Sequence, residues 1–237
     1  MQQQVDMMTQ CASFYCRVER HSISPQGKEI LSIVATYPRS ILPEFNTHCV
    51  IGKNTSSSRA IPYSRAGERK NTQPPSMREM VSLSPYFPIY WGRKEGGMQA
   101  SSELTGEEIS VCRQKLERAK WHMIGVCDEL WDIGMAKQDI NRYLEPWGWT
   151  TQILTGTEWA NFWALRTHKD AHPAFRYIAR KMYVAYRRSK PTLLKEGDWH
   201  LPFTDEADAG LSIEDQKRIS VARCARLSYN TFDGVRD

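Results

Sequence analysis

The sequence lacks the patterns that mark secreted, membrane-spanning or metal-binding proteins. Its six cysteines form no C-x-x-C pair, and no cluster of cysteine and histidine has the spacing of a zinc site. No run approaches the roughly 18 apolar residues of a membrane span, and the first ten residues lack the apolar core of a signal peptide. These absences predict a cytoplasmic protein with free thiols, no metal and no membrane partner.

The sequence also lacks a strong charge of either sign and contains no internal repeat. The formal net charge is +5 over 237 residues, which suits an anionic ligand such as a nucleotide but is equally explained by a solvated lysine-rich surface. It is far below the clustered basicity of a nucleic-acid-binding domain, so we expect no nucleic-acid partner. The length is enough to bury a sizeable core, and we treat residues 1–237 as one domain.

Local patterns predict strands where β-rich runs meet Pro and Gly. Strands are expected at residues 12–22, 29–37 and 149–155. The first two flank the turn Ser24-Pro25-Gln26-Gly27. Residues 54–103, which are rich in Ser, Pro, Gly and Arg, are expected to be mostly loop.

Capping signals and apolar spacing predict the helices. Helices are expected at residues 105–133, 157–166, 173–189 and, in part, 39–53, where Pro43 must lie in a first turn. The clearest helix starts with the capping box Thr105-x-x-Glu108, and its apolar residues recur at three- and four-residue spacing, as expected of a core face. Ser212 begins a last helix that leads into the strand-like run ISVARCARLSY. These elements predict an α+β fold of mixed helices with a modest, largely antiparallel sheet.

Three short segments carry residues suited to binding an anion or a flat heterocycle. The run T-H-C-V-I-G-K-N-T-S-S-S-R at 47–59 offers hydroxyl groups and an Arg for a phosphate, although Ser-rich segments are usually plain loops. Asn161 to Arg166 places an Arg among aromatic residues, which fits either a stacked heterocycle or an aromatic core with an outward Arg. Arg142 can clamp an anion or pair with Glu145.

An ordered set of motifs extends from about residue 20 to residue 230. It comprises S-I-S-P-Q-G at 22–27, Y-P-R at 37–39, E-F-N-T-H at 44–48, S-S-R-A-I-P at 57–62, Y-W-G at 90–92, G-M-Q-A at 97–100, N-R-Y-L-E-P at 141–146, T-E-W-A-N-F-W-A-L-R at 157–166, W-H-L-P at 199–202 and I-S-V-A-R-C-A-R at 219–226. Taken in this order, the set resembles the flavin-dependent thymidylate synthases, in particular their long, phage-type branch.

The resemblance implies a site assembled from these motifs. It implies FAD contacts from Thr47, His48, Asn54 and Asn161, and dUMP contacts from Glu44, Ser57, Ser58, Arg59, Arg142 and Arg166. Arg166, against the uracil, and Ser57 are the implied catalytic residues. The implied reaction converts dUMP to dTMP, with methylenetetrahydrofolate as carbon donor and NADPH as reductant through FAD, in a homotetramer with shared active sites.

The chain departs from the family signature at several positions, which leaves two other functions open. Cys49 and Gly52 replace an Arg and a Ser, and His172 replaces a Gln. The chain stops at Asp237, before an H-x-S-P-F-E-H segment that long members use to bind flavin, so we expect a truncated C-terminus or a site completed in another way. The alternatives are a hydroxymethylase acting on dUMP or dCMP and a degenerate, non-catalytic nucleotide-binding homologue.

Overall fold

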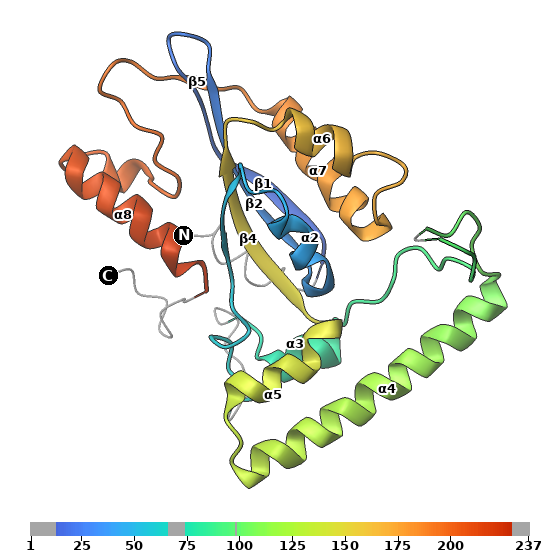
Figure 1. The fold of residues 1–237 in the computed structure, drawn as a ribbon. Helices are drawn as coiled ribbons and strands as arrows, with labels where there is room; N and C mark the ends of the chain where they lie inside the picture. Colours follow the sequence, from blue (N-terminus) through green and yellow to red (C-terminus); the bar gives the residue numbers. More distant parts are fainter. Residues whose placement is uncertain (1–12, 66–73, 98, 229–237) are drawn as a thin grey trace.

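A five-stranded sheet runs through the molecule in the order β3-β4-β2-β1-β5 (Figure 1). The computed structural model describes residues 13–65, 74–97 and 99–228. The strands are β1 Tyr15–Ile23, β2 Glu29–Pro38, β3 Gly52–Thr55, β4 Trp149–Gly156 and β5 Thr192–Leu193. Neighbouring strands are antiparallel except for the short parallel pair β1 and β5. The predicted α+β fold with a largely antiparallel sheet is therefore confirmed.

The first two strands form the predicted hairpin, with slightly shifted bounds. The N–H of Gly27 donates to the carbonyl of Ser24 over 2.9 Å. Gly27 has a φ of 82°, a left-handed conformation that glycine adopts without the steric cost that a Cβ brings. The predicted strand at residues 149–155 is β4, which pairs with β2 along its whole length.

Helices cover both faces of the sheet and one of its ends (Figure 1). The α-helices are α2 Leu42–Asn46, α3 Met77–Leu83, α4 Gly106–Ile133, α5 Lys137–Leu144, α6 Ala160–Arg166, α7 Pro173–Arg188 and α8 Ile213–Ala225. The 3-10 turns are η1 Arg39–Ile41, η2 Glu145–Trp147, η3 Glu206–Asp208 and η4 Arg226–Ser228. In the described residues, no helix is long and apolar enough to cross a membrane.

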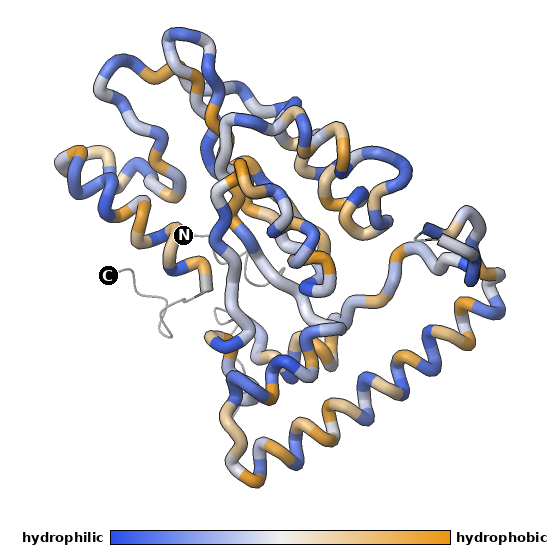
Figure 2. The backbone as a smooth tube through the Cα atoms, in the orientation of Figure 1, coloured by the Kyte–Doolittle hydropathy of each residue, from blue (hydrophilic) through white to orange (hydrophobic). Residues whose placement is uncertain are grey.

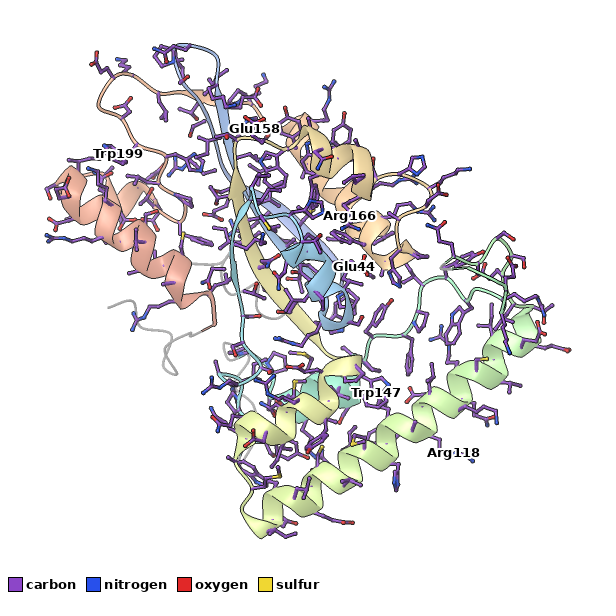
Figure 3. All side chains as sticks on the ribbon, in the orientation of Figure 1. Glu44, Arg118, Trp147, Glu158, Arg166 and Trp199 are labelled. Atoms are coloured by element: carbon purple, nitrogen blue, oxygen red, sulfur yellow. The ribbon has the colours of Figure 1, made fainter. Side chains whose placement is uncertain are left out.

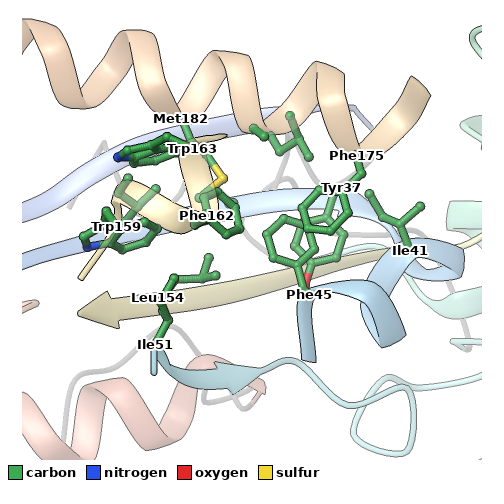
Figure 4. Packing of buried hydrophobic residues seen from close by; sticks show 14 of the residues in the cluster. Tyr37, Ile41, Phe45, Ile51, Leu154, Trp159, Phe162, Trp163, Phe175 and Met182 are labelled. Atoms are coloured by element: carbon green, nitrogen blue, oxygen red, sulfur yellow. The ribbon is translucent and has the colours of Figure 1, made fainter. Parts of the chain in front are cut away.

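Strand β2 lies near the middle of the sheet and is buried on both faces. Its residues Leu31, Ile33 and Tyr37 pack into the main core cluster with side chains from α6 and α7 (Figure 4). Val34 points to the opposite face, where Ile153 and the segment before α8 cover it. This alternation follows from the two-residue period of a strand, so one strand supplies both hydrophobic layers.

Helix α4 begins where its capping box predicts, but its apolar face is only partly buried. The Thr105 side chain accepts from the Glu108 N–H, and the Glu108 side chain accepts from the Thr105 N–H. Ile124 and Cys127 pack with α3 and α5, whereas Ile133 is 82% exposed. Apolar residues recur along the helix in Figure 2. The expectation that the whole stripe faces the core is therefore wrong, since little of the described chain packs beside the first half of α4.

Of the other helix predictions, some are confirmed and some are wrong. Pro43 and Pro173 stand in the first turns of α2 and α7, as expected. Thr157 does not cap α6, because that helix starts at Ala160 after Trp159 and has no side-chain cap. Helix α3, with its own capping box at Ser76, was not predicted inside the loop-rich segment.

The strand-like run near the C-terminal end is helical. Ser212 caps α8 as predicted, accepting from the Asp215 N–H over 3.2 Å. The helix then continues through Cys224 to Ala225. Its β-branched residues do not form a strand, because the capped helix keeps its own hydrogen bonds and covers the second face of the sheet, where Cys224 packs on the core.

Candidate functional site

Four of the predicted site residues meet around the guanidinium of Arg166. Its Nε–H donates to Nε2 of His48 over 2.7 Å, and Nη2 donates to Thr47 Oγ1 over 3.1 Å. Nη1 lies 3.6 Å from the Glu44 carboxylate. Figure 3 shows Glu44 and Arg166 pointing toward one another from α2 and α6. We call these four residues the Arg166 cluster.

The aromatic core positions the Arg166 cluster. The guanidinium lies 4.6 Å over the ring of Phe175, and the His48 ring meets the Phe162 ring edge-on at 4.9 Å. Both rings belong to the main core cluster, so the polar groups rest on rigid side chains. The Asn161–Arg166 segment thus combines an aromatic core with a half-buried Arg at its edge, an arrangement compatible with both alternatives.

The surroundings of His48 favour the neutral imidazole. Burial, the Arg166 charge and the Lys53 charge, in that order, lower its pKa from 6.5 to about 4. Because Nε2 accepts the bond from Arg166, the ring proton lies on Nδ1, where the described residues provide no hydrogen-bond partner. The cluster therefore pairs one cation, Arg166, with one carboxylate, Glu44, and offers one free N–H at His48.

The remaining predicted nucleotide residues form a second group, which we call the Ser57 loop, at residues 56–59 beside α5. The Asn141 amide donates to the carbonyl of Ser58 over 2.8 Å, and Arg59 Nη2 lies 3.4 Å from Gln138 Oε1. Arg142 is exposed on the same helix, and we find no hydrogen-bond partner for its guanidinium among the described residues. Its cation is available to an anionic ligand.

Two further residues fix the chain on both sides of Ser57: Arg39, which was given no role from the sequence, and Glu145, which was considered only as a partner of Arg142. Buried Arg39 donates from Nη2 to the carbonyl of Ser56 over 2.8 Å. Ser58 Oγ donates to Glu145 Oε1 over 2.6 Å, and the same oxygen lies 3.8 Å from Arg39 Nη1. Burial lowers the pKa of Arg39, an effect that the Glu145 carboxylate opposes. Both residues belong to motifs quoted from the sequence, and that membership is the signal that could have identified them.

Glu145 therefore serves a different partner from the one suggested by its spacing. The alternative of an Arg142–Glu145 pair is not seen, since the Glu145 carboxylate is taken by Arg39 and Ser58. This leaves Arg142 free of a carboxylate. The geometry favours the first alternative, in which Arg142 meets an anion from outside.

The Arg166 cluster and the Ser57 loop lie on either side of β3. Four residues of extended chain span about 13 Å, and β3 separates His48 from Ser57 along the sequence. Asn54, on β3, donates from Nδ2 to the carbonyl of Cys224 over 2.6 Å, so it supports the end of α8. Asn161 is exposed on α6. The structure thus divides the predicted residues between two places.

The comparisons with known proteins identify the fold. Two solved structures of PolB, described as a UMP/dUMP methylase from Streptomyces cacaoi, match the chain. The structure bound with 5-Br UMP matches with a TM-score of 0.58 and 14% identity, over 92% of this chain and 97% of PolB. The chain has the PolB fold.

The second PolB match and the other comparisons mark the limit of that similarity. The structure bound with 5-Br dUMP matches with a TM-score of 0.52 and 17% identity, over 68% of this chain and 67% of PolB. No protein-family model matches the chain, and no curated protein sequence matches it. The PolB-like fold is therefore seen in the arrangement of the elements and not in close sequence identity.

Proposed function

We propose that this protein methylates a pyrimidine nucleoside monophosphate, converting dUMP to dTMP, with methylenetetrahydrofolate as carbon donor and NADPH as reductant through FAD. One observation carries the proposal. Glu44, Thr47 and His48 of one motif converge on Arg166 of another, 118 residues further along the chain from His48. The PolB-like fold supports it, because PolB is described as a UMP/dUMP methylase.

The Arg166 cluster suits a pyrimidine that gains negative charge as it reacts. His48 accepts a hydrogen bond from the guanidinium and, as a neutral group, does not cancel its charge. The Phe175 ring packs against the guanidinium. A fixed, partly buried cation stabilises an oxyanion more than a mobile one does, since it need not reorganise during the reaction. We therefore assign Arg166 to the uracil of dUMP, with Glu44 and Thr47 orienting the guanidinium.

The Ser57 loop suits the phosphate end of the nucleotide. Arg142 and Arg59 offer guanidinium groups, and Ser57 lies beside them, whereas the buried Ser58 hydroxyl, also assigned to dUMP from the sequence, is taken by Glu145. Bidentate Arg contacts with phosphate are among the stronger charge-assisted hydrogen bonds. The anchoring of the loop by Arg39 and Glu145 keeps these donors in place before the ligand arrives.

The residues present also fit a flavin. His48 offers an unpartnered Nδ1–H at the surface of the core. Asn161 offers an exposed amide on α6. These groups, with Thr47, would hold the flavin ring by hydrogen bonds to its heteroatoms. Asn54, which the resemblance also assigns to FAD, instead bonds the end of α8 on the second face of the sheet, so it does not join this group. Bound FAD would supply the hydride that the reaction needs.

We propose that the site is shared between the subunits of a homotetramer, as the family resemblance implies. In such a site, one nucleotide would meet the Arg166 cluster of one subunit and the Ser57 loop of another. Mixing Arg166→Gln protein with Arg142→Gln protein should restore activity if sites are shared, because some mixed sites contain neither change. Two inactive variants that stay inactive after subunit exchange would argue for a site within one subunit.

The central experiment is an incubation of FAD-loaded protein with NADPH, methylenetetrahydrofolate and one of dUMP, UMP or dCMP, read by mass spectrometry of the nucleotide. A methyl gain on dUMP supports the proposal, and its loss in Arg166→Gln but not in the surface variant Lys115→Gln ties it to the site. A hydroxymethyl gain on dUMP or dCMP would establish the alternative activity, and the absence of product from all three would refute catalysis by the flavin-loaded protein.

A further inference from the structure

Helix α7 holds a charge equal to the whole positive surplus of the chain. It carries Arg176, Arg180, Lys181, Arg187 and Arg188 and no acidic residue. The formal net charge of the protein is +5, so the rest of the chain is formally neutral. The net positive charge, which is mild for the whole sequence, is therefore equal to the charge of this one helix.

The cations of α7 are not neutralised by carboxylates. In the part of the chain that the structure describes, none of the ion pairs includes a cation of α7. Arg176 donates from Nη1 to the carbonyl of Lys169 over 2.6 Å, and Arg180 donates from Nε to the carbonyl of Thr167 over 3.3 Å. Bonds to neutral carbonyls hold the two guanidinium groups in place and leave their charges for a partner.

Tyrosines alternate with the cations on the exposed face of α7. Tyr177 is 45% exposed and Tyr183 is 38% exposed. Residues three and four apart share a helix face, so Tyr183 lies between Arg180 and Arg187. The opposite face packs against the sheet through Ile178 and its neighbours, which fixes the direction of this face.

A cavity of about 300 Å³ lies at the C-terminal end of the same face. It shares Tyr183 and Arg187 with α7 and is lined by further aromatic side chains, namely Trp159, Trp163 and Tyr186. Figure 4 shows Trp159 and Trp163 side by side at this end of the core. A concave aromatic site next to a row of cations suits a ligand that has flat rings and repeated negative charges.

The cavity also contains two carboxylates, and both have partners. Glu29 Oε2 accepts from the Tyr186 hydroxyl over 3.0 Å and lies 3.3 Å from the ring of His21. Glu158 pairs with Lys28. The charge of Glu158 is thereby offset by Lys28, whereas Glu29 keeps its negative charge and can accept an N–H from a base.

We propose that the exposed face of α7 and the adjoining aromatic cavity bind single-stranded nucleic acid. Arginines match the phosphates, which they bind through a fork, and exposed rings stack on bases regardless of sequence. Sixteen residues of helix extend about 24 Å, a length that matches the short sites of single-strand binders. This proposal replaces the expectation of no nucleic-acid partner, and it does not rest on the proposed nucleotide methylation.

The test measures fluorescence anisotropy of a labelled 12-residue oligo-dT with the full chain at several salt concentrations. Five phosphate contacts predict a slope of about −3.5 for log K against log salt, since single strands give about −0.7 per contact. Affinity should therefore fall roughly 100-fold between 50 and 200 mM salt.

Matched variants locate the contact. Arg180→Gln with Arg187→Gln should make the slope shallower by about 1.4, because two of the contacts are lost. Lys115→Gln with Arg118→Gln removes the same charge from the exposed side of α4, labelled at Arg118 in Figure 3, and should leave the slope unchanged. Tyr177→Ala with Tyr183→Ala should weaken binding about tenfold per ring at constant slope. Thermal midpoints confirm that each variant folds.

Three results would overturn the proposal. The first is no binding of oligo-dT at 50 mM salt by protein that is folded. The second is an equal change of slope in the α4 and α7 variants, which would indicate a diffuse charge effect. The third is binding to phosphatidylglycerol vesicles that the α7 changes abolish while oligo-dT remains unbound, which would assign the face to a membrane surface.

Discussion

The neutral state of His48 gives a quantitative prediction about the Arg166 cluster. The folded protein lowers the pKa of His48 from 6.5 to about 4 through burial, Arg166 and Lys53. Because the folded pKa lies below the unfolded one, the unfolded chain binds more protons between these values. The stabilisation from neutral His48 is therefore complete above about pH 6.5 and declines as the pH falls toward 4.

The expected size follows from the same two values. Each pKa unit corresponds to about 1.4 kcal/mol, so the full effect is at most about 3.5 kcal/mol. Only part of it is reached at moderate acidity, and a change from pH 7.5 to pH 5 should remove about 2 kcal/mol. The side chain of His48 is nearly buried, at 8% exposed, so solvent screening takes little from this figure.

Urea unfolding of the wild type and His48→Gln at pH 7.5 and pH 5 checks the prediction. Gln keeps an oxygen that can accept from Arg166 but does not titrate, so the variant should lose about 2 kcal/mol less than the wild type over this range. The pKa of His200 is also lowered to about 4, mainly by burial, but it contributes equally to both proteins. Equal losses in the two proteins would refute a neutral His48 in the folded state, and an NMR titration of its ring near 6.5 would do the same.

Three further substitutions test individual contacts by urea unfolding. Glu145→Gln should cost roughly 1 to 3 kcal/mol, since it leaves the buried Arg39 charge without its carboxylate; an unchanged stability would show that the pair at 3.8 Å contributes nothing. Asn54→Ala should cost about 1 kcal/mol and speed amide exchange in α8, because the Cys224 carbonyl loses its donor; exchange that stays slow would count against this anchor. Thr105→Ala should cost about 1 kcal/mol through loss of the capping box, whereas Ser110→Ala, inside the same helix, should not.

The sequence predicted correctly those helix ends that are determined by residues within one turn. The capping box at Thr105, the N-cap Ser212 and the prolines of the first turns fixed where helices begin, since each signal acts within one turn. The box at Ser76 is equally local, but the surrounding Ser- and Pro-rich composition concealed it. The run in α8 was wrongly described as strand-like, because β-propensity depends on the surface against which a segment packs.

The site was predictable as a set of residues but not as an arrangement. The family resemblance brought Glu44, His48 and Arg166 together as residues of one site, and the structure places them in contact. It did not reveal Arg39, whose role depends on being buried beneath a loop 17 residues away. Nor could it separate the Arg166 cluster from the Ser57 loop, because the course of β3 between them is a property of the folded sheet.

The position of β3 at the edge of the sheet has a consequence for dynamics. Strand β3 pairs with β4 on one side, is four residues long, and leads directly into the Ser57 loop. Edge segments with few cross-strand bonds open at a lower free energy than central strands such as β2. Because Arg39, Asn141 and Glu145 hold the Ser57 loop through side-chain hydrogen bonds, the loop can keep its place while β3 itself opens and closes.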